Sequence, residues 1–498
     1  MSTVSTTAGL VRGRSRGRGF AFLGIPYAEP PCGERRFRAP VPRAPWSGVL
    51  DCVAYGPTPQ RRAMAEVTAI PEPSIPGADV LTLNVFTPDP KAAGLPVLVY
   101  IHGGGYIAGS PASPWYDGTA FNRDGVVVVT IAYRLAFEGY GHLPDAPANR
   151  GVRDQIVALE WVRDNIAAFG GDPGKVTIAG QSAGGGSVMH LLVAPTARGL
   201  FRGAIAFSGS PGDRTVADAA ATTRELADKL GVPPDLAGFG GVDEWELVAA
   251  QGIGAGFGGG PPSREGVLGA ISTLSAGLRM APTVDGEVLP WTVAEGLARG
   301  EGADVALLLG ATRDEFSMIA LGAASLFDGA DPVDLLVRTG LRPDAAAGYA
   351  AALAGRSPAT VLGQSVTDRV FRRRVVEWTA LRAGASAPTF AYDFAWRSGL
   401  DGLSGHCLDV PFAWDVLGDE HVARLTGDTP PQELADTVHG ACVAFVRDGD
   451  PGWPAWNGEG PVMTWDTTSA VTDAAAYGSA RLLADTDPAR PCSPPCDT

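Results

Sequence analysis

Six short apolar runs recur along the chain, and segments of helical pattern separate them. The runs are rich in β-branched side chains and show almost no polar alternation, which is typical of strands covered on both faces. They lie at residues 97–101, 126–131, 176–179, 204–207, 305–309 and 389–392. Apolar residues from 152 to 166 recur near helical spacing until a Gly-Gly-Asp-Pro sequence stops them. The pattern predicts an α/β fold with a mostly parallel central sheet flanked by helices.

Between about residues 215 and 385 the pattern loosens into Ala-rich segments of helical character. We predict a large helical insertion here, which forms a cap or gorge wall over the sheet. Within this range, Gly254, Gly256 and Gly259 match the pattern G-x-G-x-x-G. Because no strand leads into these glycines, a flexible loop is favoured over a dinucleotide site.

The 498 residues are predicted to form a single domain, 1–498, because no Pro/Ser-rich linker, charge block or internal repeat divides them. A tail containing Pro and Cys follows from about residue 486 to 498. Its Cys492 and Cys496 have no other Cys/His cluster near them in sequence, so a metal site is not expected. No cofactor is expected either.

Composition restricts the classes of partner. The net charge of −15 disfavours nucleic acid and anionic membranes, and no apolar stretch approaches the length of a membrane span. The first seven residues lack the basic region and apolar core of a secretory signal. Six cysteines are too few for a dense disulfide framework, so a cytoplasmic protein is expected. The oligomeric state is not predicted, because one sequence does not distinguish an exposed apolar patch from a buried face.

The most informative motif is Gly-Gln-Ser-Ala-Gly at residues 180–184, between the apolar run 176–179 and a helical segment. A serine hydroxyl is a poor nucleophile unless a histidine takes its proton and backbone amides meet the oxyanion. A tight strand-to-helix turn provides both. Ser182 is therefore the predicted nucleophile, and the Ala183 amide a predicted oxyanion donor. The same pattern at residues 13–17 lies among four arginines without a helix after it, and we interpret it as an exposed turn.

A second glycine-rich loop, His-Gly-Gly-Gly at residues 102–105, directly follows the apolar run 97–101. It is therefore expected at the carboxyl edge of the sheet, where α/β enzymes bind ligands. Glycines let the backbone approach a substrate closely. The amides of Gly104 and Gly105, together with that of Ala183, are predicted to form an oxyanion hole.

The candidate base and acid come later in the chain. Of six histidines, His406 is favoured, because it follows the run 389–392 on a late connection and triads on such folds run serine, acid, histidine. His421 and His439 are the competitors. The acid should follow the run 305–309, and from the residues alone Asp314 and Glu315 are nearly equal candidates.

These motifs resemble the type-B carboxylesterase family, which includes cholinesterases and bacterial para-nitrobenzyl esterases, over nearly the whole chain. The resemblance implies the α/β-hydrolase fold and names Glu315, the glutamate of the Asp-Glu pair, as the acid. It also implies a serine close to the acid, which Ser208 matches. The motifs lie at residues 22–28, 36–37, 83–88, 102–105, 132–135, 149, 154–155, 169–173, 180–184, 207–211, 285–286, 314–315, 406, 411–412 and 453–454.

Three departures from the family pattern stand out. Gln181 replaces the usual glutamate before the nucleophile, which removes a negative charge but leaves the turn intact. Residues 58–60 and 78–81 lack the cysteines of an early disulfide found in many secreted relatives, which favours an intracellular, bacterial-type enzyme. Phe316 replaces the glycine that usually follows the acid, and adds bulk beside it.

We therefore predict a serine carboxylesterase that cleaves small to medium acyl esters through an acyl-enzyme. Amide, carbamate or lactone hydrolysis by the same triad is the first alternative, and a non-catalytic adhesion module on the same fold is a remote one. Tyr106, Trp115 and Phe316 are candidate pocket-lining aromatics. Matched ester, amide and carbamate substrates would separate the enzymatic alternatives.

Overall fold

The computed structural model describes residues 1–59, 70–252 and 262–484. The candidate glycines 254, 256 and 259, the tail and its two cysteines therefore lie outside the described residues. Within the described residues, no helix combines the length and apolar character that a membrane crossing needs.

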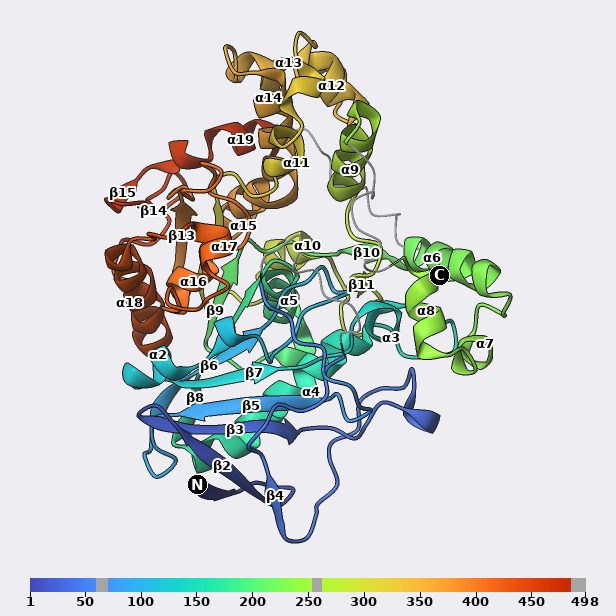
Figure 1. Ribbon diagram of the computed structural model, residues 1–498, viewed down its shortest axis with the longest axis vertical. Helices are drawn as coiled ribbons and strands as arrows, with labels where there is room; N and C mark the ends of the chain where they lie inside the picture. The colour runs from blue at the N-terminus through green and yellow to red at the C-terminus, as the bar shows by residue number, and fades with distance from the viewer. Residues whose placement is uncertain (60–69, 253–261, 485–498) are drawn as a thin grey trace.

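A sheet of 13 strands forms the centre of the molecule, in the order β1-β2-β3-β5-β7-β6-β8-β9-β12-β13-β14-β15, with β4 beside β2 (Figure 1). Neighbours from β7 through β6 to β14 are parallel, whereas β1, β2, β3 and β5 add an antiparallel edge. The six predicted runs correspond to β6, β7, β8, β9, β12 and β13. The strands are β1 (Ser2–Ser5), β2 (Leu10–Arg16), β3 (Gly19–Pro26), β4 (Val49–Asp51), β5 (Thr82–Thr87), β6 (Leu95–Ile101), β7 (Val127–Ile131), β8 (Gly171–Gln181), β9 (Gly203–Phe207), β12 (Ala306–Thr312), β13 (Thr389–Phe394), β14 (Val462–Trp465) and β15 (Ala470–Thr472).

Both faces of the sheet are covered, which explains the unbroken apolar runs. Along β6, Val97 and Val99 belong to one core cluster and Leu98 and Tyr100 to the other, because successive side chains of a strand point to opposite faces. The helices α4 (Arg150–Asn165) and α5 (Ala183–Val193) pack on the first face. The helix α18 (Gln432–Asp448) packs on the second.

The range 215–385, in which a helical insertion is predicted, also contains the predicted strand run 305–309. The strand β12 lies inside this range and inside the central sheet, because its apolar residues need cover on both faces. The helices α6 (Val216–Leu230), α7 (Leu236–Gly240) and α8 (Glu244–Ala250) gather at one side of the sheet (Figure 1). The helix α9 (Arg264–Ala276) packs instead against helices that follow β12. Its partners are α11 (Met318–Leu321), α12 (Pro332–Arg338) and α14 (Pro358–Thr367). The other two helices of this group are α13 (Pro343–Ala352), which packs on α12, and α15 (Arg373–Leu381).

The remaining short elements connect these layers. They are α2 (Thr119–Arg123), α3 (Ala136–Tyr140), β10 (Arg214–Thr215), β11 (Thr283–Val284), α10 (Val293–Ala298), α16 (Val410–Ala413), α17 (Ala423–Thr426) and α19 (Gly478–Ala484). The second match to the serine motif, residues 13–17, lies mostly in β2 rather than in a turn, with Ser15 exposed and paired to Phe20 of β3.

The parallel register brings the carboxyl ends of the central strands together. Ile101 of β6 pairs with Gly180 of β8, and Gln181 pairs with Phe207 of β9. Gly310 of β12 pairs in turn with Phe207. The loops that follow β6, β8, β9 and β12 therefore emerge at one edge of the sheet.

Candidate active site

Ser182 lies on a sharp turn between β8 and α5. Its φ of 59° and ψ of −122° are strained for a residue with a side chain. A Cβ on Gly180 would lie 2.4 Å from the backbone of Gly184, and one on Gly184 would lie 2.0 Å from the carbonyl oxygen of Ile101. Only glycine fits at both positions. The Ser182 side chain stays partly exposed between buried neighbours.

The loop after β6 borders this turn. A Cβ on Gly103 would lie 3.2 Å from the Cβ of Ser182. Gly104 and Gly105 have φ values of 108° and 61°, which favour glycine. In the described part of the chain, the amides of Gly104, Gly105 and Ala183 donate to no acceptor. Three free donors therefore lie on the two backbone segments around Ser182.

His406 and Glu315 contact each other through His406 Nδ1 and Glu315 Oε2. Both side chains are buried, and their loops are also joined by backbone, because the His406 amide donates to the Glu315 carbonyl at 3.0 Å. A carboxylate only accepts hydrogen bonds, so Nδ1 carries a proton and Nε2 is left for chemistry.

The other oxygen of Glu315 is held by two donors. Ser208 Oγ donates to Oε1 at 2.6 Å, and the Thr312 amide donates to the same atom at 2.8 Å. Ser208 directly follows β9. It is the serine that the family resemblance implied close to the acid. The adjacent Asp314 turns away and accepts from the Ser404 amide at 2.8 Å and from Arg397. Glu315 is therefore the acid that the fold brings to His406.

The pKa of His406 is raised well above its ordinary value. Burial alone would lower it, but Cys407 and the Glu315 carboxylate outweigh that effect. Burial also raises the pKa of the Cys407 thiol, which keeps the thiol neutral near pH 7. The carboxylate facing Nδ1 is therefore the charge that stabilises a protonated His406.

Two phenylalanines pack on the His406 ring. The ring centroids of Phe316 and Phe371 each lie 4.7 Å from that of His406. Phe371 comes from a single π-helical turn, Asp368–Arg372, between α14 and α15. Such turns are frequent at functional sites. Nothing in the local sequence pattern marked Phe371, because a π-helical turn has no simple periodicity.

Of the three aromatics expected to line a pocket, only Phe316 is partly exposed beside the site. Tyr106 and Trp115 are each 0% exposed and belong to the two core clusters. Tyr106 packs edge-on against Tyr140, and Trp115 Nε1 donates to Asp419 at 3.3 Å. Neither presents accessible surface to a substrate, because core packing took precedence over the pocket.

The remaining histidines lie elsewhere. The pKa of His102 is lowered to about 4 by burial, and its ring stacks on Tyr133. His421 contacts Asp419 at 3.1 Å, and His439 contacts Asp124 at 3.0 Å. Within the described residues, neither competitor contacts Glu315. The described residues also contain no cluster of three or more potential metal ligands.

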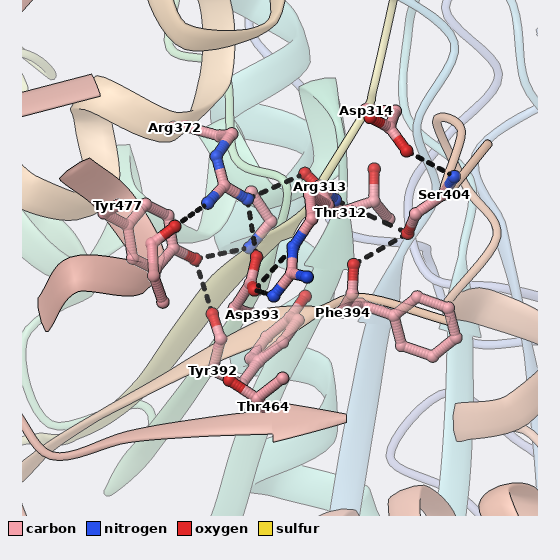
Figure 2. A network of polar contacts seen from close by, with 12 residues as sticks. Thr312, Arg313, Asp314, Arg372, Tyr392, Asp393, Phe394, Ser404, Thr464 and Tyr477 are labelled. Atoms are coloured by element: carbon pink, nitrogen blue, oxygen red, sulfur yellow. Dashed lines mark hydrogen bonds and ion pairs between the residues drawn. The ribbon is translucent and has the colours of Figure 1, made fainter. Parts of the chain in front are cut away.

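A buried ionic network anchors the loop that carries Glu315 (Figure 2). Arg372 donates to Asp393 at 2.6 Å and to the carbonyl of Thr312 at 3.2 Å, and Arg313 pairs with the same aspartate. Asp393 lies on β13, next to β12 in the sheet. The acid loop is thereby tied to the π-helical turn on one side and to β13 on the other.

Comparison with known proteins assigns the chain to a family. Residues 1–472 match the Carboxylesterase family. The chain belongs to the carboxylesterase family. The para-nitrobenzyl esterase of Bacillus subtilis is 34% identical over 487 residues, which cover 92% of this chain and 93% of the relative. The phenmedipham hydrolase of Pseudarthrobacter oxydans is 34% identical over 498 residues, with the same coverage.

Solved structures agree with this assignment. A crystal structure of a carboxylesterase from Geobacillus stearothermophilus superposes with a TM-score of 0.82 at 34% identity, and covers 97% of this chain and 99% of that one. This carboxylesterase therefore has the α/β-hydrolase fold. It is a serine hydrolase of carboxylic esters, and its substrates are small molecules.

Proposed function

We propose that this carboxylesterase works through Ser182, His406 and Glu315. His406 Nε2 takes the proton from Ser182 Oγ as the oxygen attacks the acyl carbon, and then gives it to the leaving alcohol. Water hydrolyses the acyl-enzyme with His406 again as base. Glu315 keeps the proton on Nδ1 and stabilises the imidazolium. The main support is the contact between His406 Nδ1 and Glu315 Oε2 beside a serine turn that only glycines could flank.

The amides of Gly104, Gly105 and Ala183 are proposed to hold the oxyanion. Their support is that all three lie next to Ser182 and donate to no other acceptor in the described residues. Removal of one such donor typically lowers kcat by about 100-fold or more.

Substrates are proposed to carry small to medium acyl groups, and Phe316 is proposed to narrow the pocket beside the acid. The name of the Bacillus relative makes para-nitrobenzyl esters the first compounds to test, and that of the Pseudarthrobacter relative adds phenmedipham. Amide, carbamate and lactone hydrolysis is compatible with the same arrangement but is not favoured. Rates on matched ester, amide and carbamate substrates would distinguish these activities.

We also propose a reducing, cytoplasmic location. Its support is that Cys32, Cys52, Cys407 and Cys442 are free thiols. Thiol labelling of the enzyme in intact cells, in comparison with a secreted control protein, would test this location.

The test of the triad is hydrolysis of a para-nitrophenyl ester series, with intact-mass detection of a phosphonate adduct. Wild type should hydrolyse the esters and take one adduct, and Ser182→Ala should do neither. Ser15→Ala is the matched control, because Ser15 lies in the same five-residue pattern away from the site, and it should behave as wild type. An adduct on Ser182→Ala, or a folded but inert wild type, would overturn the proposal.

A further inference from the structure

The side chain of Gln181 reaches the catalytic face of His406. Gln181 Nε2 lies 3.2 Å from His406 Nε2, and the two side chains are 225 residues apart in sequence. Both residues are buried. A Cβ on Gly103 would lie 2.9 Å from Gln181 Oε1. The carboxamide therefore lies between the His-Gly-Gly-Gly loop and the imidazole, immediately next to the nucleophile.

The direction of this hydrogen bond is set by chemistry. Because Glu315 holds a proton on Nδ1, a neutral His406 has only a lone pair on Nε2. An amide NH2 only donates, so the Gln181 contact is a hydrogen bond to the neutral imidazole. A protonated imidazole would place two donors against each other. The contact therefore favours the neutral form and opposes the effect of Glu315.

The nucleophile has no comparable partner. Among the residues that the structure describes, the Ser182 hydroxyl makes no hydrogen bond. The lone pair that must accept its proton is occupied by Gln181 instead. An ester that fills the site would have to bring Ser182 Oγ to Nε2, in exchange for the amide.

We propose that Gln181 is a positioning residue that favours the neutral, proton-accepting form of His406 against the effect of Glu315 in the substrate-free enzyme. This role rests on the proposed assignment of His406 as the base. It predicts that the residue at position 181 sets where activity is lost in acid. The family glutamate would do the opposite, because its carboxylate would accept from a protonated Nε2 and favour the inactive form.

No other described charge competes at this face. Glu315 lies on the loop after β12 and faces Nδ1, while Cys407 and Asp409 follow His406 on its own segment. Phe316 and the π-helical turn contribute uncharged rings. A change at position 181 should therefore alter the acid limb without moving these groups.

The experiment measures kcat/KM for para-nitrophenyl butyrate from pH 5 to 9 in wild type, Gln181→Glu and Gln181→Met. Gln181→Glu should move the midpoint of the acid limb up by about one pH unit or more. Gln181→Met removes the donor without adding charge, and should move it upward by less. Gln432→Glu adds the same charge at the start of α18 and should leave the midpoint unchanged.

Circular dichroism should first show that each variant is folded. If Gln181→Glu does not fold, the pH profile of Gln181→Met alone tests the proposal. Midpoints of both Gln181 variants within about 0.2 units of wild type would overturn the proposal. A wild type with no acid limb, or an active Ser182→Ala, would instead overturn the triad assignment. The two failures are therefore distinguishable.

Discussion

Ser208→Ala tests whether the support of the acid, rather than its presence alone, sets the rate. Ser208 Oγ donates to Glu315 Oε1 at 2.6 Å in a fully buried environment. The substitution removes one of the two donors on that oxygen and leaves the Thr312 amide at 2.8 Å. The Glu315 carboxylate then loses one of the two hydrogen bonds that orient its Oε2 toward His406.

The magnitude follows from the charge on the acceptor. A hydrogen bond to a charged group contributes about 1.5–3 kcal/mol. If the whole of this free energy were added to the activation barrier, the rate would fall about 10–150-fold. Glu315 is charged before and during the reaction, so only the orienting part affects the rate. We therefore expect kcat/KM to fall about tenfold, with KM little changed. Unfolding should become easier by about 2 kcal/mol.

The assay combines steady-state hydrolysis of para-nitrophenyl butyrate with calorimetric unfolding. At an unfolding entropy of about 2.1 cal/mol/K per residue, a chain of 498 residues loses about 1 °C of Tm per kcal/mol. Ser208→Ala should therefore melt only about 2 °C lower. Ser365→Ala is the matched control, because its buried Oγ donates to the Leu362 carbonyl at 2.7 Å in α14. Because this acceptor is neutral, Ser365→Ala should lose about 1 kcal/mol of stability and no activity.

Two results would refute this reasoning. One is a Ser208→Ala enzyme with wild-type kcat/KM despite the lost hydrogen bond. The other is an equal loss of activity in Ser365→Ala, which would mean that the rate follows general stability rather than the support of Glu315.

Two further predictions concern pH and the anchoring network. A protonated His406 accepts no proton, and its pKa is raised. Wild-type kcat/KM should therefore fall as the pH is lowered, with a midpoint above the ordinary histidine pKa of about 6.5. A rate that is flat from about pH 5 to 8 would contradict this prediction. Arg372→Met leaves Asp368 and Asp393 short of a buried partner and should cost about 3–5 kcal/mol, or about 3–5 °C in Tm by calorimetry. The double variant with Asp393→Asn should lose less than the sum of the single changes, and simple additivity would show that the pair is not coupled.

Much of the fold was predictable because it depends on local rules. Buried parallel strands need unbroken β-branched runs, and β6, β7, β8, β9, β12 and β13 all carry them. The serine turn was equally readable, since Gly180 and Gly184 are required by contacts within a few residues or with the adjacent strand. The prediction of His406 as the base rested on chain order. Each of these features is encoded in a segment that can be read by itself.

The sequence by itself therefore determined the strands, the nucleophile turn and the short set of candidates for base and acid. From the residues alone Asp314 and Glu315 were nearly equal and the family resemblance favoured Glu315, whereas only the tertiary structure shows that Glu315 contacts His406 and that Asp314 contacts the Ser404 amide instead. The tertiary structure also brought Gln181 and Phe371 to His406 and buried Tyr106 and Trp115. The physical reason is that propensity and periodicity act along the chain, whereas these contacts depend on the order and register of strands far apart in sequence.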